Sequence, residues 1–359
     1  MIKLATLFSG IGAIEEALKQ LEIEYNIVFA CDNGEREISF DVNSIKQDIK
    51  GKDVCEINKL IEDIYYTLSN KPNKMQIQYE ANFEVPKGHF YQDVRLLDAT
   101  IYKKEKIDLL LGGSPCQSFS VIGKRGGFED TRGTLFFEYA RIIKESQPKV
   151  FIYENVLGML THDKGKTWDT IQNVFNELGY SIKVNIMNAK NYGIPQDRKR
   201  IFVVGTKKEN TFEKPLEIEL NTTIKDYLEK EVDPKYYMGE KGFKFVTNPK
   251  YKNRAKVNAS IMMCQKANQQ FNWNGDFIFE PIESIFNQNI LNRAYVGEFK
   301  GEKGVVRKLT PRECLRLMGF SDNYKIVVDD NMAWRQAGNA IVVNVLKLII
   351  KELMEKGLL

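Results

Sequence analysis

A cysteine lies where the chain could hold a reactive side chain, in the segment Gly112-Gly113-Ser114-Pro115-Cys116-Gln117. The largely apolar run Ile107-Asp108-Leu109-Leu110-Leu111 precedes it, and a short apolar run bounded by glycines predicts a buried parallel strand. Open α/β sheets bind their ligands at the carboxyl ends of such strands, and Pro115 stiffens the turn that follows. Cys116 is therefore a candidate nucleophile, whereas most free cysteines are small buried apolar residues.

Carboxylate and guanidinium groups occur at other predicted strand ends. Glu154 follows the strand pattern 149–153, and Arg198 and Arg200 lie in a polar segment that leads into the strand pattern 200–206. A glutamate whose pKa is raised by burial can act as a general acid, and arginines can donate hydrogen bonds to a carbonyl oxygen. The alternatives are a helix cap for Glu154 and surface ion pairs for the two arginines.

The amino-terminal residues predict a site for a nucleotide-like cofactor. The strand pattern 2–7 turns through Phe8-Ser9-Gly10-Ile11-Gly12 into a helix over 13–21. Such units receive a ligand at the helix amino terminus, and the absence of a third glycine at the dinucleotide spacing counts against a pyrophosphate. Asp32 follows the next strand pattern, 26–30, where a carboxylate can accept from both ribose hydroxyls or cap a helix.

Strand and helix patterns alternate over residues 1–206, which predicts a doubly wound α/β domain. Its other elements are helices over 134–146 and 168–178 and a hairpin-like pair of strands over 180–187 and 200–206. Residues 41–88 are polar and lysine-rich. They contain one amphipathic helix, 54–68, and are interpreted as an insertion without assignable chemistry.

The alternating pattern ends near residue 207. Residues 207–305 predict a smaller, irregular domain in which basic and aromatic residues are interleaved, a composition that suits nucleic-acid binding but is also that of an ordinary surface. Regular structure returns with a capped helix over 310–318 and an apolar helix over 340–354. We expect a first domain of residues 1–206 completed by 330–359, and a second domain with its hinge over 207–329.

Composition places the chain among ordinary globular proteins. The 359 residues carry a net charge of +4, which permits nucleic-acid binding without requiring it. Five scattered cysteines fit a reducing cytosol, and two histidines without a Cys-x-x-Cys pair argue against a metal site. No apolar run reaches membrane-spanning length and no signal peptide is visible, so we expect a cytoplasmic protein.

Six blocks together resemble the bacterial-type DNA (cytosine-5) methyltransferase family. They are Phe8 to Gly12, Gly113 to Gln117, Glu154 to Val156, Gln196 to Arg200, Arg307 to Glu313, and Gly338-Asn339. Each block alone is weak, but their common order and compatible spacing make the resemblance specific. It covers nearly the whole chain except residues 41–88 and 207–305.

The resemblance implies a Rossmann-like domain that binds S-adenosylmethionine, with a smaller target-recognition domain. The cofactor residues that match the family's motifs are Phe8, Gly10, Gly12, Asp32, Asp93, Pro115 and Asn339, with Phe8 against the adenine and Asp32 on the ribose. The chain departs from the family at three positions: Thr6 replaces a usual aspartate, Ala13 a common glycine and Ala340 a usual serine.

In the implied reaction, the Cys116 thiolate adds to position 6 of cytosine. Glu154 supplies a proton or hydrogen bond to ring nitrogen 3, and Arg200 and Arg198 donate hydrogen bonds to the carbonyl oxygen of the base. The base must be rotated out of the duplex, and the basic loop 121–132, with Lys124 and Arg125, is expected to close over it.

The expected partner is double-stranded DNA, a cognate restriction endonuclease would be a further one, and we expect a monomer. The alternatives are an enzyme acting on transfer RNA, whose Cys-Phe-Thr tripeptide is absent here, and a catalytically silent DNA-binding regulator.

Overall fold

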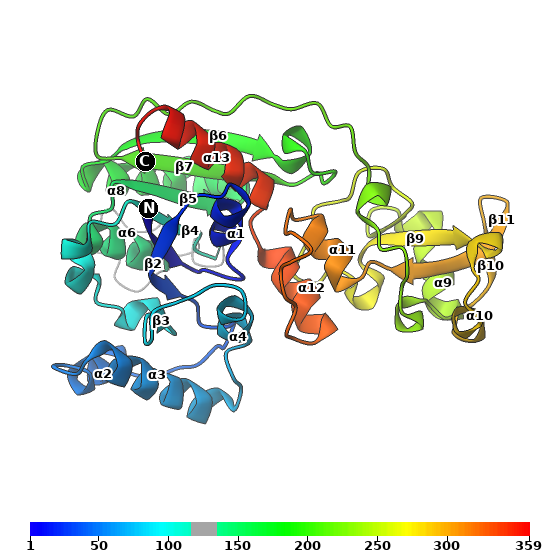
Figure 1. Cartoon of the computed structure of the whole chain (residues 1–359), viewed down its shortest axis with the longest axis horizontal. Coiled ribbons are helices and arrows are strands. Elements are labelled where there is room, and N and C mark those ends of the chain that lie inside the picture. Colours follow the sequence, from blue (N-terminus) through cyan, green and yellow to red (C-terminus); the bar gives the residue numbers. More distant parts are fainter. Residues whose placement is uncertain (116–134) are drawn as a thin grey trace. The chain divides into compact units, whose positions relative to one another are not determined.

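The computed structural model describes residues 1–115 and 135–359, which form two compact units (Figure 1). Unit 1 consists of Met1–Met187, Lys199–Leu216 and Val345–Leu359, and unit 2 of Asn188–Arg198 and Glu217–Asn344. Residues 188–198 and 330–344, which the sequence pattern assigns to the first domain, group with unit 2.

A seven-stranded sheet forms the centre of unit 1, in the order β3-β2-β1-β4-β5-β7-β6. The first five strands in this order pair in parallel, whereas β7 pairs antiparallel with β5. The strands are β1 Ile2–Leu7, β2 Tyr25–Cys31, β3 Phe90–Tyr91, β4 Leu109–Gly112, β5 Val150–Asn155, β6 Ser181–Asn188 and β7 Lys199–Thr206. The doubly wound α/β prediction is confirmed. The order reverses between β1 and β4, and sheets of this kind bind ligands at that point.

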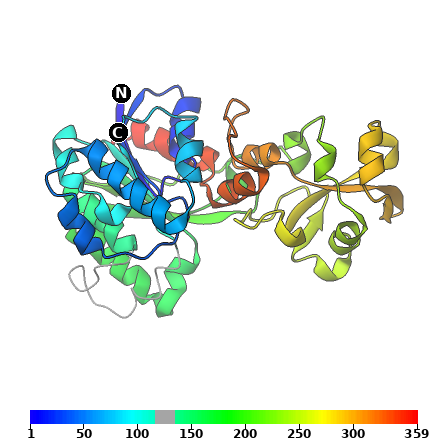
Figure 2. The same cartoon turned by 90° about the horizontal axis from the view of Figure 1, so that it is seen from below.

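Helices cover both faces of this sheet (Figures 1 and 2). Helices α1 (Ala13–Gln20) and α13 (Val343–Glu355) lie side by side on one face, where Lys347 Nζ donates to Gln20 Oε1 at 3.1 Å. Helices α6 (Leu135–Ser146) and α8 (Lys166–Glu177) cover the other, with the short α7 (Gly158–Thr161) before α8.

The core under α6 and α8 is aromatic. The Phe151 and Phe175 ring centroids are 4.6 Å apart, and Phe136 packs on Phe175 at 5.6 Å. Gly205 is paired with Phe151, and a Cβ there would come within 2.1 Å of the Phe151 ring. The strand therefore needs a glycine at this position to accommodate the ring.

The predicted insertion contains three helices: α2 (Val42–Asp48), α3 (Val54–Ser69) and α4 (Lys74–Glu80). Only α3 was predicted, and α2 and α3 share a small core with Leu96. Helix α4 differs, because Tyr79 is fully buried and its ring lies 5.4 Å from that of Phe90 on β3. Residues 74–83 therefore pack as part of the core of unit 1.

Unit 2 contains a four-stranded sheet in the order β10-β11-β9-β8, which is more regular structure than the sequence indicated. Its strands are β8 Ala255–Val257, β9 Gly275–Pro281, β10 Gly297–Phe299 and β11 Glu302–Lys308, and its helices are α9 Glu240–Val246, α10 Gln288–Arg293, α11 Pro311–Arg316 and α12 Asp330–Asn339. Helix α12 was missed, and the predicted helix 340–354 begins three residues later, at Val343.

Candidate active site

The turn after β4 is fastened to the end of β5. Ser114 Oγ lies 2.7 Å from the Tyr153 hydroxyl, and Asn155 Nδ2 donates to the Ser114 carbonyl oxygen at 2.9 Å. A Cβ on Gly113 would come within 2.6 Å of the Glu154 carbonyl oxygen, so the approach requires glycine. Sequence patterns assigned no role to Ser114, Tyr153 or Asn155. The only signal was that they lie next to candidate residues.

Cys116, Lys124 and Arg125 lie outside the described residues, and the described turn ends at the exposed Pro115. The chain that leads to Cys116 is nevertheless placed beside Glu154, since a Cβ on Gly113 would lie 3.1 Å from Glu154 Oε2.

Glu154 and Arg200 form an ion pair between neighbouring strands. Arg200 Nε lies 3.1 Å from Glu154 Oε1, and the two side chains are 18% and 14% exposed. Their partial burial strengthens the pair relative to one in open water. The pair can hold a carboxyl group in one orientation and place a hydrogen-bond donor beside it, which general acid–base chemistry requires.

Arg198 lies in different surroundings, within unit 2. The residue is 4% exposed, and its guanidinium donates to the carbonyl oxygens of Gln265, Gly338 and Ala340. These contacts tie the chain around residue 265 to the end of α12. In the described structure Arg198 therefore joins backbone segments, and its predicted catalytic role stays a prediction.

The glycine-containing turn after β1 is fixed to the end of β2. Phe8, Gly10 and Gly12 have φ angles of 53°, 54° and 78°, in the left-handed region that glycine tolerates without cost. Ser9 N donates to the Cys31 carbonyl oxygen at 3.1 Å, and Thr6 Oγ1 lies 2.8 Å from Ser9 Oγ. Thr6 thus holds the turn where the family usually has a carboxylate.

Asp32 directly follows β2, at the carboxyl end of that strand. One oxygen accepts from Gly10 N at 2.9 Å and the other from Gly34 N at 2.8 Å, and burial raises the pKa of this carboxyl. A carboxylate offers about four acceptor positions. The contacts within the described residues therefore leave room for two hydroxyl donors, so this residue fits the adenosine part of S-adenosylmethionine.

Asp93 has different surroundings from Asp32. Its Oδ2 accepts from the Tyr65 hydroxyl at 2.7 Å and from Arg95 Nη2 at 2.6 Å, and its Oδ1 accepts from Arg95 N and Nε at 2.9 and 3.0 Å. Protein groups thus occupy all four acceptor positions. Asp93 is 4% exposed, and direct contact of its carboxylate with a cofactor stays a prediction.

Asn339 is the last residue of α12, in unit 2, whereas the resemblance implied a position on the carboxyl-terminal helix. A Cβ on Gly338 would come within 2.1 Å of the Lys266 carbonyl oxygen, so this end of α12 lies tightly against residues 266–267. The predicted role of Asn339 in closing the cofactor pocket stays untested.

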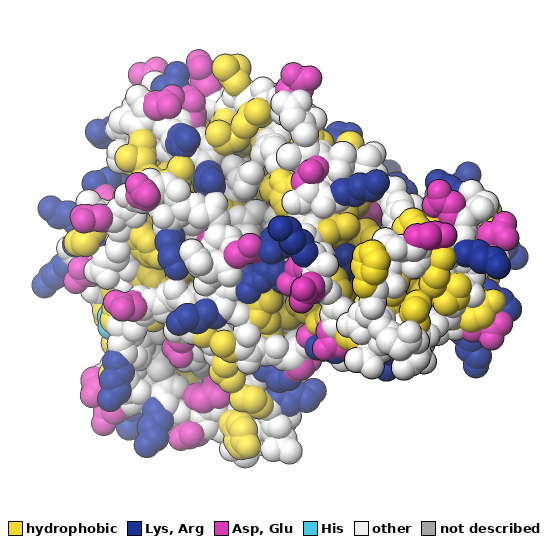
Figure 3. Space-filling view, turned by 45° about the vertical axis from the view of Figure 1, so that its right-hand side comes forward, with side chains coloured by type: hydrophobic (Ala, Val, Ile, Leu, Met, Phe, Trp, Pro, Cys, Tyr) yellow, Lys and Arg dark blue, Asp and Glu magenta, His cyan; other side chains and the backbone are white. Residues whose placement is uncertain are grey.

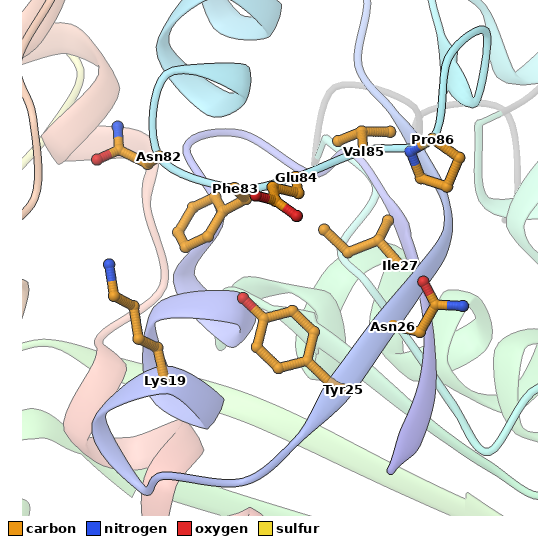
Figure 4. Close-up of a pocket in the computed structure, with 9 residues that line it drawn as sticks. All are labelled: Lys19, Tyr25, Asn26, Ile27, Asn82, Phe83, Glu84, Val85 and Pro86. Atoms are coloured by element: carbon orange, nitrogen blue, oxygen red, sulfur yellow. The ribbon is translucent and has the colours of Figure 1, made fainter.

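A pocket of about 520 Å³ opens elsewhere in unit 1 (Figure 4). The rings of Tyr25 and Phe83 both point into it, and the other lining residues are Lys19, Asn26, Ile27, Asn82, Glu84, Val85 and Pro86. None of the predicted cofactor residues lines this pocket. The cofactor assignment therefore rests on the strand-end geometry and not on this cavity.

Charge on the face shown in Figure 3 is mixed, with lysine and arginine side chains interspersed among aspartate and glutamate. Within residues 1–115 and 135–359, no three histidine, cysteine, aspartate or glutamate side chains gather as metal ligands would. Over the same residues, no helix is long and apolar enough to cross a membrane.

Comparison with known proteins identifies close relatives. A family model described as C-5 cytosine-specific DNA methylase matches residues 62–355. The chain is 38% identical over 302 residues to the Type II methyltransferase M.HpaII of Haemophilus parainfluenzae, a match that spans 78% of this chain and 80% of that protein. It is 37% identical over 281 residues to the Type II methyltransferase M.HhaI of Haemophilus parahaemolyticus, spanning 76% and 81%. The S. pombe Dnmt2 methyltransferase structure has the same fold, with a TM-score of 0.66 at 20% identity over 99% of both chains.

Proposed function

Because the chain belongs to the C-5 cytosine-specific DNA methylase family and is a DNA (cytosine-5) methyltransferase, we propose that it methylates carbon 5 of a flipped-out cytosine in a specific duplex sequence. The methyl donor is S-adenosylmethionine, which supplies an electrophilic methyl group when bound. The observation that carries the proposal is the Glu154–Arg200 ion pair beside the turn that leads to Cys116.

The chemistry needs a nucleophile, a proton donor and a hydrogen-bond donor. The Cys116 thiolate adds to ring carbon 6, because cysteine is strongly nucleophilic and also leaves readily at the end. Addition moves electrons onto ring nitrogen 3, where the Glu154 carboxyl donates a proton or a hydrogen bond. Arg200 orients Glu154 and donates to the base carbonyl oxygen. Carbon 5 then behaves as an enamine carbon and takes the methyl group, after which its proton is lost and Cys116 leaves.

The base must leave the duplex before this reaction, since a stacked base cannot present its two faces to different reactants. Unstacking costs about a few kcal/mol. We assign loop 121–132 to closing over the flipped nucleotide, with Lys124 and Arg125 on the phosphates.

Unit 2 is proposed to read the flanking bases through an amide turn, residues 268–274, of sequence Asn-Gln-Gln-Phe-Asn-Trp-Asn. The turn contains no glycine, yet Gln270, Asn272 and Trp273 have positive φ angles of 66°, 47° and 53°. Such strained backbone persists only where neighbours hold it, and it concentrates at functional positions. Arg254 Nη2 donates to the Asn272 carbonyl oxygen at 2.9 Å, and Trp273 packs 5.1 Å from Phe245. Asn268 and Asn272 are exposed, whereas Gln269 and Gln270 are buried. The two exposed amides suit an adenine edge, which pairs with Asn through two hydrogen bonds.

Transfer of a labelled methyl group to duplex DNA and to transfer RNA, with Cys116→Ser as control, tests the function. Label in DNA alone, lost in the variant, supports the proposal. Label in transfer RNA alone would favour the RNA enzyme, and no label in either would favour a silent DNA-binding regulator. The proposal also includes a cognate restriction endonuclease, a monomeric state and a cytoplasmic location, which this assay does not test. Neighbouring genes would test for the endonuclease, and sedimentation would test the monomeric state.

A further inference from the structure

Helix α3 contacts Asp93, at the end of β3, and Arg36, in the turn that begins at Asp32 after β2. Glu62 and Tyr65 are three residues apart, so they lie on the same face of the helix. Tyr65 is only 2% exposed, whereas its neighbours Asp63 and Tyr66 are exposed. The helix therefore presents one polar pair to the sheet and an equivalent pair to solvent.

Tyr65 holds the end of β3. Its hydroxyl donates to Asp93 Oδ2 at 2.7 Å, and burial together with the charge of Asp93 raises the pKa of the phenol. The bond from this hydroxyl to a carboxylate is of the stronger, charge-assisted kind.

Glu62 holds the turn after β2. Arg36, four residues beyond Asp32, is 4% exposed, and its two terminal nitrogens donate to both Glu62 oxygens at 3.2 and 3.1 Å. Its Nε donates to the Asn33 carbonyl oxygen at 2.9 Å, and its guanidinium lies 4.7 Å over the Tyr65 ring. The paired geometry fixes the turn that begins at Asp32.

A third group joins the two strand ends directly. Gln92 Oε1, next to Asp93, accepts from both Arg36 Nη2 and Asn73 Nδ2, and Asn73 Nδ2 also donates to the Asp32 carbonyl oxygen at 2.8 Å. Asp32 and Asp93 are thus parts of one hydrogen-bonded network that α3 closes from outside.

We infer that α3 is a positioning element of the cofactor site, in which Glu62 and Tyr65 set the separation of the strand ends at Asp32 and Asp93 and thereby the affinity for S-adenosylmethionine. This inference deepens the proposed function and rests on it. It gives the segment without assignable chemistry a role that neither helix propensity nor motif spacing reveals.

The test measures binding of S-adenosylhomocysteine to the DNA-free protein by titration calorimetry. Tyr65→Phe and Glu62→Gln each remove one interaction with little change of volume, and Tyr66→Phe and Asp63→Asn are the matched controls on the exposed face. We expect the dissociation constant to rise about five- to tenfold in the first two variants and to stay unchanged in the controls. At saturating S-adenosylmethionine, kcat should be unchanged while KM for the cofactor rises, a split that general destabilisation does not produce.

The outcomes separate this inference from the proposed function. If the parent protein fails to bind S-adenosylhomocysteine, the proposed function fails and the inference with it. If the parent binds but both Tyr65→Phe and Glu62→Gln bind equally well, α3 does not position the site and only the inference is overturned. If the urea midpoint shows that Tyr65→Phe or Glu62→Gln is unfolded, S-adenosylhomocysteine binding by the other variant tests the inference.

Discussion

Arg198 and Arg200 are separated by one residue, yet their guanidinium groups bind in different units. Arg200 Nε lies 3.1 Å from Glu154 Oε1 in unit 1, whereas Arg198 donates to the carbonyl oxygens of Gly338 and Ala340, at 3.1 and 2.9 Å, in unit 2. The two arginines of one motif should therefore fail in different ways when they are replaced.

Replacing Arg200 should slow the chemical step. Arg200→Ala removes the group that orients Glu154 and that donates to the base carbonyl oxygen, so we expect kcat to fall about 10²- to 10³-fold. Affinity for DNA should change little, because phosphate contacts elsewhere supply most of it. Single-turnover methyl transfer on duplex DNA measures the effect, with the exposed Lys199→Ala as control. Equal turnover by Arg200→Ala and the parent would contradict the assignment.

Replacing Arg198 should instead destabilise the fold. Arg198→Ala leaves three buried carbonyl oxygens without their donor, which costs roughly 3 kcal/mol of unfolding free energy. Urea unfolding followed by tryptophan fluorescence measures it. A stable Arg198→Ala protein that has lost only turnover would show that Arg198 acts on the substrate.

The fold of unit 1 could be predicted because its signals are local. The strand over residues 2–7 and the helix that starts at Ala13 need only apolar periodicity and two glycines, and both are confirmed within a residue at each boundary. Glu154 and Arg200 could be proposed as candidates because Glu154 follows one strand pattern and Arg200 begins another. The sequence does not show that these strands, β5 and β7, are adjacent.

The rest depended on contacts between distant residues. The bond from Tyr65 to Asp93 spans 28 residues and that from Arg198 to Ala340 spans 142. Neither has a periodic signal. Strands β8, β9 and β10 of unit 2 were missed because β8 and β10 have three residues each, and the apolar residues 277–279 of β9 do not alternate with polar ones.

Covalent catalysis by Cys116 predicts a trapped complex. Duplex DNA with 5-fluorocytosine at the target should accept the thiolate and the methyl group but should not release the enzyme, because the final elimination removes a proton from carbon 5 and fluorine cannot leave in that way. Denaturing electrophoresis should show an adduct that depends on S-adenosylmethionine and disappears in Cys116→Ser. An adduct that survives in this variant would point to another nucleophile.

Glu15 predicts a pH dependence of stability. It is fully buried in α1, where it accepts from the Tyr79 hydroxyl, and burial raises its pKa from 4.5 to about 7. Below pH 4.5 the carboxyl is protonated in both the folded and the unfolded protein. Between pH 4.5 and 7 only the unfolded protein releases this proton, so the free energy of unfolding falls by up to roughly 3 kcal/mol as pH rises. Glu15→Gln should remove this fall. Burial also raises the pKa of Asp276 to about 7. Asp276 therefore contributes a similar fall in the free energy of unfolding to both the parent and Glu15→Gln. Identical pH profiles of unfolding would contradict the prediction.

The amide turn predicts where sequence preference is encoded. In Asn272→Asp the new side chain also tolerates the left-handed backbone, and the backbone carbonyl oxygen of residue 272 can still accept from Arg254. The substitution replaces the side-chain amide donor with a carboxylate. A bidentate amide contact discriminates between bases by about 1–3 kcal/mol, so the preference should relax by roughly 5- to 150-fold at a single A·T pair near the target cytosine. Turnover on permissive sequences should survive, because Glu154 and Arg200 are untouched. Bisulfite sequencing of a randomised duplex library measures this, with Asn289→Asp on α10 as the control on another exposed part of unit 2. If Asn272→Asp keeps the parent's sequence profile, base recognition does not depend on this turn.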